Sequence, residues 1–106
     1  MENKEIKVVD SYVLDFIKEK NLENSFAWLV DNVSKFFEKA DYFEIDFCGG
    51  EDVLLCLRVF SNYNIYMFSD IRYKFCSALR ENGYKELYTL LAVFQRRNRK
   101  EIVDGY

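Results

Sequence analysis

The sequence predicts one α+β domain spanning residues 1–106, and three observations support this. The chain has the length of a typical domain, half of its 106 residues are apolar and 18% are aromatic, which suffices for a shared core. Apolar residues recur with a period of about 3.6 residues, typical of helices, on both sides of a central segment. Between Asp41 and Phe60 the period falls to two, as in strands.

The N-terminal part predicts two helices. Asp10 or Ser11 can cap the first, which ends near Asn21, and Asn24 can cap the second. The apolar stripes that predict them are Ile6, Val9, Val13, Phe16 and Ile17 for the first helix, and Phe26, Leu29, Val30, Val33, Phe36, Phe37 and Ala40 for the second.

Residues 42–60 predict an antiparallel hairpin that turns at Gly49-Gly50. Phe43, Ile45 and Phe47 alternate with polar neighbours, so one face of the first strand is expected to be buried. If the apolar residues of both strands share that face, the favoured register sets Phe47 opposite Val53, with pair numbers that sum to 100. A three-residue loop with a glycine bulge then closes the hairpin.

The C-terminal part predicts a short third strand and two further helices. Residues 65–68 fit the strand, and Ser69 or Asp70 can cap a helix that ends at Asn82-Gly83. Residues 84–98 favour a last helix because of their length, their apolar stripe and the cations near their end. The apolar run 90–94 also fits a buried strand beside the hairpin, and the order then becomes ααβββαβ.

The composition argues against an enzyme. Histidine is absent, which excludes Ser/His and Cys/His nucleophile pairs and metals held by histidine. No glycine-rich phosphate loop, GxSxG or HExxH motif occurs, so we expect no cofactor and no metal. The three cysteines, Cys48, Cys56 and Cys76, form no CxxC pair and indicate reduced thiols. In the predicted register the first two lie roughly 13 Å apart along the strands, too far for a disulfide.

The same patterns predict a cytoplasmic protein. The first residues carry both signs of charge and do not form the apolar block of a secretory signal. The longest apolar runs are about a quarter of the ~20 residues that a membrane helix needs, so no membrane partner is expected.

Charge is unevenly distributed along the chain. Residues 1–60 contain seven Lys/Arg and thirteen Asp/Glu, a balance of −6, whereas residues 61–106 contain eight Lys/Arg and five Asp/Glu, a balance of +3. If folding keeps the halves apart, the molecule has an acidic face and a smaller basic end.

The acidic residues concentrate on the outer face and tip of the predicted hairpin. They are Asp41, Glu44, Asp46, Glu51 and Asp52. The aromatic residues Tyr42 and Trp28 are candidate anchors for a partner protein. This pattern favours an inhibitor that docks on the basic surface of a nucleic-acid-handling protein, such as a toxin immunity protein or a phage anti-defence protein. The structural alternatives are a solvated strand face and, for Trp28, a partly buried position on the rim of its helix.

The basic residues suggest a second function. Arg96, Arg97, Arg99 and Lys100 can contact phosphates, which makes nucleic acid the alternative partner. They can equally stabilise the end of a helix, and a sequence pI near 5.0 is low for a dedicated nucleic-acid binder. A homodimer that joins two sheets is left open by the sequence.

Overall fold

The computed structural model describes residues 6–49 and 54–97. The elements are β1 (Ile6–Val8), α1 (Tyr12–Glu19), α2 (Glu23–Phe36), β2 (Tyr42–Cys48), β3 (Leu54–Phe60), α3 (Ile65–Glu81), α4 (Lys85–Leu90) and β4 (Leu91–Arg96). This confirms the predicted α+β class. None of the helices in the described part of the chain is long and apolar enough to cross a membrane.

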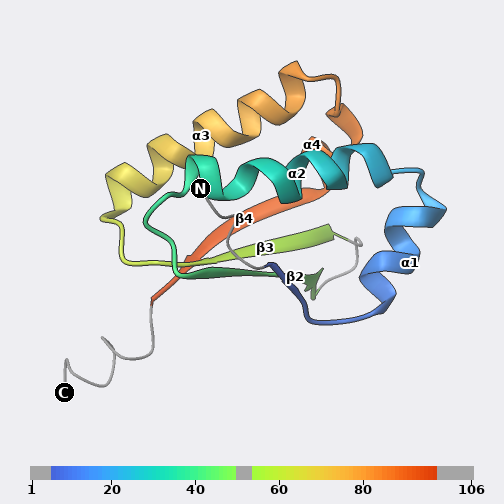
Figure 1. Ribbon diagram of the computed structural model, residues 1–106, viewed down its shortest axis with the longest axis horizontal. Helices are drawn as coiled ribbons and strands as arrows, with labels where there is room; N and C mark the ends of the chain where they lie inside the picture. The colour runs from blue at the N-terminus through green and yellow to red at the C-terminus, as the bar shows by residue number, and fades with distance from the viewer. Residues whose placement is uncertain (1–5, 50–53, 98–106) are drawn as a thin grey trace.

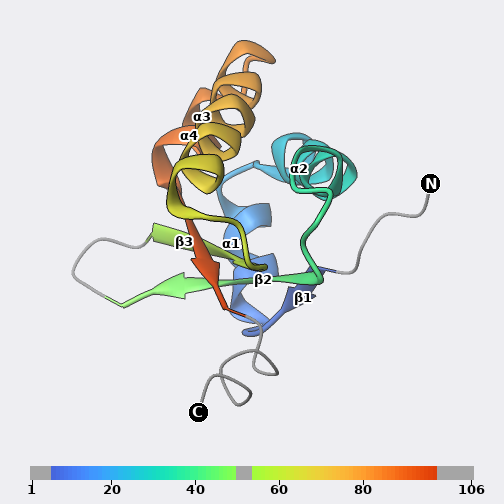
Figure 2. The same cartoon turned by 90° about the vertical axis from the view of Figure 1, so that its left-hand side faces the viewer.

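The four strands form one mixed sheet in the order β1-β2-β3-β4. The central pair, β2 and β3, is the predicted antiparallel hairpin, and each outer strand runs parallel to its inner neighbour. Two helices connect β1 to β2, and two connect β3 to β4, so each half of the chain has the order β-α-α-β. Helices α2, α3 and α4 lie on one side of the sheet and α1 lies at one end of it, and none of the described elements crosses the other side (Figures 1 and 2).

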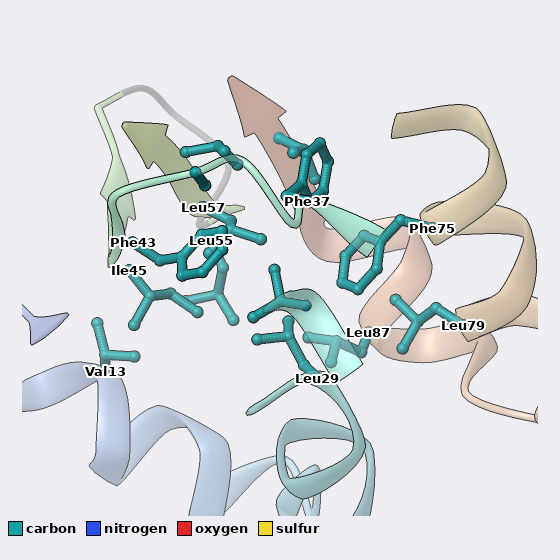
Figure 3. Packing of buried hydrophobic residues seen from close by; sticks show 14 of the residues in the cluster. Val13, Leu29, Phe37, Phe43, Ile45, Leu55, Leu57, Phe75, Leu79 and Leu87 are labelled. Carbon is teal, nitrogen blue, oxygen red and sulfur yellow. The ribbon is translucent and has the colours of Figure 1, made fainter. Parts of the chain in front are cut away.

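The core lies between the sheet and the helices that cover it (Figure 3). Phe43, Ile45, Leu55 and Leu57 project from the hairpin and are completely buried, as the alternation in the sequence predicts. Phe37, directly after α2, is buried at the centre of an aromatic cluster, with its ring 6.5 Å from that of Phe43 between centroids. This packing holds the helices on one face of the sheet only.

Local signals explain the ends of α1 and α3. The Asp10 carboxylate accepts a hydrogen bond from the Tyr12 amide at 2.9 Å, and α1 is followed by Asn21 with a φ of 57°. Gly83, with a φ of +90°, ends α3 as predicted, because glycine takes positive φ without strain. Asn24 does not cap α2, which begins at Glu23 without a side-chain cap.

Two predicted elements at the ends of the sheet are corrected. Ile6 belongs to a short strand rather than to the first helix, because it pairs with Phe43 of β2. Residues 91–96 form strand β4, so the predicted last helix is wrong beyond Leu90 and the strand alternative is right there. Pairing with β3 makes this segment a strand, since a short apolar run by itself fits either a strand or a helix.

The third strand predicted at residues 65–68 is instead the first turn of α3. The Asn64 side chain accepts a hydrogen bond from the Met67 amide at 2.8 Å and caps the helix there. Ser69 and Asp70 therefore lie inside α3 and do not cap it.

The predicted register of the hairpin is wrong by two residues. The observed pairs sum to 102, so Phe47 lies opposite Leu55 and Glu44 opposite Arg58. A shift of two keeps every side chain on its predicted face, because the side-chain period of a strand is also two. The shift lengthens the loop beyond three residues and makes Cys48 a diagonal neighbour of Cys56, closer than predicted.

Candidate interaction surface

The uncovered side of the sheet, here called the open face, is the candidate functional site. Its side chains are those that alternate with the buried residues of each strand, and the strand register places them in neighbouring rows. The open face comprises Lys7 from β1, Tyr42, Glu44, Asp46 and Cys48 from β2, Leu54, Cys56, Arg58 and Phe60 from β3, and Ala92, Phe94 and Arg96 from β4.

Arg58 holds the two carboxylates of β2 at the centre of the open face. Its Nη1 lies 3.4 Å from Glu44 Oε1, and its Nη2 lies 3.3 Å from Asp46 Oδ2. All three side chains are only 20–22% exposed. Burial works to lower the pKa of Arg58, but the hydrogen bond to Asp46 and the surrounding negative charge outweigh it, and the pKa of Arg58 is raised. The guanidinium therefore stays charged and is shared by two acids.

An aromatic pair stands beside this ion-pair network. The rings of Tyr42 and Phe60 are stacked with centroids 4.3 Å apart and planes 7° apart. They are direct partners across β2 and β3, so the register creates the stack. Tyr42 is 41% exposed and Phe94 on β4 is 48% exposed. The open face thus presents aromatic surface to solvent.

The basic end of the chain adjoins the same surface. Arg96 lies opposite Phe60 in the register of β3 and β4. A shallow depression of about 750 Å³ is lined by Tyr42, Glu44, Arg58, Phe60, Gln95, Arg96 and Arg97. It brings aromatic, acidic and basic groups from three strands to one place.

The side chain of Gln95, at the edge of this depression, forms hydrogen bonds on the side of the sheet that the helices cover. Its side-chain oxygen accepts hydrogen bonds from the Ser61 hydroxyl at 2.7 Å and from the Tyr63 amide at 2.8 Å. Its side-chain nitrogen donates to the Tyr63 carbonyl at 3.0 Å. These three bonds tie β4 to the loop that leads into α3, next to Arg96 and Arg97.

A second hollow, of about 440 Å³, lies toward the turn of the hairpin and includes Cys48, Cys56 and Phe94 in its lining. Burial, with a further contribution from neighbouring Cys48, raises the pKa of Cys56 to about 11. This thiol is therefore protonated at neutral pH. A protonated thiol is a poor nucleophile and a poor metal ligand. In the described ranges 6–49 and 54–97, no three His, Cys, Asp or Glu side chains are grouped to hold a metal ion.

The structure brings some predicted site residues together and separates others. Tyr42, Glu44 and Asp46 share the open face as predicted, whereas Glu51 and Asp52 lie outside the described residues. Trp28 lies on α2, with its ring 5.8 Å from that of Phe75 in a stacked contact, and so belongs to the covered side. Of the basic residues, Arg96 and Arg97 line the depression, and Arg99 and Lys100 lie outside the described residues.

The expected separation of an acidic face from the arginine end is corrected. Glu44 and Asp46 are matched by Arg58, and Arg96 lies on the same face because β4 is a strand beside β3 rather than a helix. Sequence reasoning missed Phe60 and Phe94 as members of the surface. The signal for Phe60 was its parity with Arg58 on the same strand, whereas Phe94 could be placed only once its segment was known to be a strand.

Comparisons of this chain with protein-family models, with curated proteins and with solved structures give no match.

Proposed function

We propose that this protein is a protein-binding module that contacts its partner through the open face and acts as an inhibitor by covering part of that partner. The observation that supports this most strongly is the sheet with helices on one side and exposed Tyr42 and Phe94 on the other. Stable interfaces are enriched in aromatic residues and arginine at their centre, surrounded by a polar rim. The open face supplies such aromatic residues and arginines, arranged around the ion pairs of Arg58 with Glu44 and Asp46.

The charges of the open face indicate which kind of partner surface would be complementary to it. Carboxylates occupy β2, and guanidinium groups occupy β3 and β4, so the surface is dipolar rather than purely acidic. A basic groove on a nucleic-acid-handling protein would meet Glu44 and Asp46, and an acidic rim beside that groove would meet Arg96 and Arg97. Inhibition of such a partner, as in toxin immunity or phage anti-defence, is the biological role we propose.

Capture by variants of the tagged protein tests this proposal. Tyr42→Ala combined with Phe94→Ala removes the exposed rings of the open face, while Tyr12→Ala removes a ring that is 69% exposed on α1. We expect the double variant to lose a partner that the wild type and the Tyr12→Ala control both enrich from a lysate of native cells, because buried aromatic anchors supply most of the binding energy. Equal enrichment by all three proteins would contradict the proposal.

A second variant pair tests the charge of the partner. Glu44→Gln with Asp46→Asn keeps the shapes of the β2 side chains but removes both negative charges, and Asp15→Asn with Glu19→Gln makes the same change on α1. A basic partner should associate more slowly with the first variant and at an unchanged rate with the second, because charge complementarity acts mainly on association.

Binding of single-stranded nucleic acid is a second candidate function. It is favoured by one observation, the position of Arg96 and Arg97 beside the stacked rings of Tyr42 and Phe60. Arginines near exposed aromatic rings suit a phosphate backbone with stacked bases. Fluorescence anisotropy with a labelled oligonucleotide at two salt concentrations separates the candidates. Affinity that falls steeply with salt and is lost in Arg96→Gln with Arg97→Gln supports nucleic acid, and no binding at low salt removes it.

A further inference from the structure

Strand β4 is the last strand in the order of the described sheet, and its outer side faces away from β3. The carbonyl of Arg96 accepts a hydrogen bond at 2.9 Å from the amide of Ser61, the residue that follows β3. Backbone groups of one residue point to the same side of a strand, and the direction alternates along it. Ala92, Phe94 and Arg96 therefore pair with β3, and the amides and carbonyls of Leu91, Val93 and Gln95 point to the outer edge.

A groove runs along this edge between β4 and α3. It has a volume of about 590 Å³, and its lining includes Ser69, Arg72, Tyr73 and Cys76 from α3, Tyr88 from α4 and residues 91–94 of β4. Tyr73 is 71% exposed, whereas Cys76 and Tyr88 are partly buried. The helical wall thus combines Tyr73, Cys76 and Tyr88 with the polar side chains of Ser69 and Arg72, and the opposite wall is a strand edge with regularly spaced backbone donors and acceptors.

The charged side chains at this groove are cationic. Arg72 is in the lining, which contains no aspartate or glutamate, and Arg96 and Arg97 follow at the end of β4. Helix α3 and strand β4 run in opposite directions (Figure 1), so the first half of α3, with Arg72, lies toward the same end of β4 as Arg96. Asp70, on α3 as well, is paired with Lys74 at 3.1 Å. The lining of the groove therefore carries positive charge at Arg72, and Arg96 and Arg97 add positive charge beyond the lining.

We propose that an extended peptide of a partner protein adds to β4 as a further strand and lies in this groove. Its backbone pairs with Leu91, Val93 and Gln95, its alternate apolar side chains contact Tyr73 and Cys76, and a carboxylate near one end meets Arg72. Addition of a strand to a sheet edge beside a helix gives affinity through main-chain bonds and specificity through alternate side chains. The groove shares Ala92 and Phe94 with the open face, but the proposed strand binds to the backbone edge of β4, and this proposal does not depend on the function proposed for the open face.

The probe for this proposal is a displayed library of random peptides selected against the immobilised full chain. Enriched peptides should share alternating apolar residues and an aspartate or glutamate at one end. N-methylation at successive positions of such a peptide should weaken binding with a period of two, because every second amide points to β4. On binding, hydrogen exchange of the Val93 and Gln95 amides should slow, while that of the Ala92 and Phe94 amides, already bonded to β3, should not change.

A charge pair provides the matched control on the protein. Arg72→Glu should weaken the selected peptides by at least about tenfold, the effect of placing like charges together at a contact. Lys18→Glu, the same change on an exposed position of α1, should leave the affinity unchanged.

Four results would overturn the proposal. The first is a selection without enriched peptides, and the second is an N-methyl scan without the two-residue period. The third is binding that is indifferent to Arg72→Glu. If the chain itself sediments as a dimer in which the Val93 and Gln95 amides are protected, the occupant is a second copy and the proposed partner peptide is wrong.

Discussion

The two faces of the sheet are built from the same strands but have opposite chemistry. On β2, Phe43 and Ile45 are fully buried under the helices, whereas the adjacent Tyr42 is 41% exposed on the open face. On β3, Leu57 is fully buried, and the next residue, Arg58, holds two carboxylates at the surface. A strand with a period of two thus carries buried residues and residues of the proposed binding surface in alternation, so neighbouring substitutions should have separable effects.

Phe43→Ala should give the largest effect on stability. Its ring is fully buried and contacts Phe37, so truncation leaves a cavity under the helices. We expect a loss of about 3–5 kcal/mol of unfolding free energy in urea titrations followed by circular dichroism. Tyr42→Ala on the same strand should cost about 1 kcal/mol or less, the range for a cross-strand aromatic pair at the surface. Similar losses for the two variants would show that the faces do not differ as described.

Gln95→Ala should give the next largest effect. The substitution removes three hydrogen bonds and leaves the buried Ser61 hydroxyl without its side-chain acceptor. We expect a loss of about 1–3 kcal/mol, because a buried polar group without its partner is costly. Gln95→Glu retains the accepting oxygen and should retain part of this stability. If the alanine variant unfolds at the same urea concentration as the wild type, the contact does not tie β4 to its loop.

Arg58→Met should give a smaller effect that depends on salt. Methionine keeps much of the aliphatic stem but leaves Glu44 and Asp46 side by side without the guanidinium. We expect a loss of about 1 kcal/mol at low salt, and a smaller loss at high salt, where charge interactions are screened. Lys74→Met, which breaks an exposed pair with Asp70, is the control and should have almost no effect. A loss that does not change with salt would mean that packing, not charge, holds Arg58.

Cys56 should react more slowly than an ordinary thiol, and its raised pKa should not affect the stability of the protein at neutral pH. Because burial and Cys48 raise its pKa to about 11, roughly one molecule in 1,000 carries the thiolate at pH 8. Iodoacetamide should label it slowly in the folded protein and quickly in urea, as measured by peptide mass spectrometry. The folded state holds this proton more tightly, so stability should fall as the pH rises from about 9 toward 11, and less so in Cys56→Ala. Rapid labelling of the folded protein at pH 8 would contradict this burial.

Much of the fold could be predicted because strong local signals determine it. The alternation around Phe43 and Ile45 identifies the hairpin and its buried face, and Gly83 identifies the end of α3. The three-residue strand β1 could not be predicted, because Ile6 also fits a helical stripe and only pairing with Phe43 makes it a strand. The register of the hairpin could not be predicted either. A shift of two residues leaves every side chain on the same face of the sheet and changes only the length of the turn.

The candidate site was harder to predict than the fold, because it depends on which strands are neighbours. Tyr42, Glu44 and Asp46 were placed on one outer face by alternation alone. Arg96 joined them only because residues 91–96 form a strand next to β3, which a short apolar run does not determine. The ion pairs of Arg58 likewise follow from the register, and this register turns an expected acidic patch into a dipolar surface.

Hydroxyl-radical footprinting of the protein in complex with its captured partner reports the exposure of individual side chains, and so it shows directly whether the partner covers the open face. Oxidation of Tyr42 and Phe94 on the open face should fall on binding, while oxidation of Tyr12 on α1 and Tyr66 on α3, which are 69% and 85% exposed, should stay the same. Protection of Tyr12 or Tyr66 with Tyr42 and Phe94 left reactive would place the partner elsewhere and contradict the account.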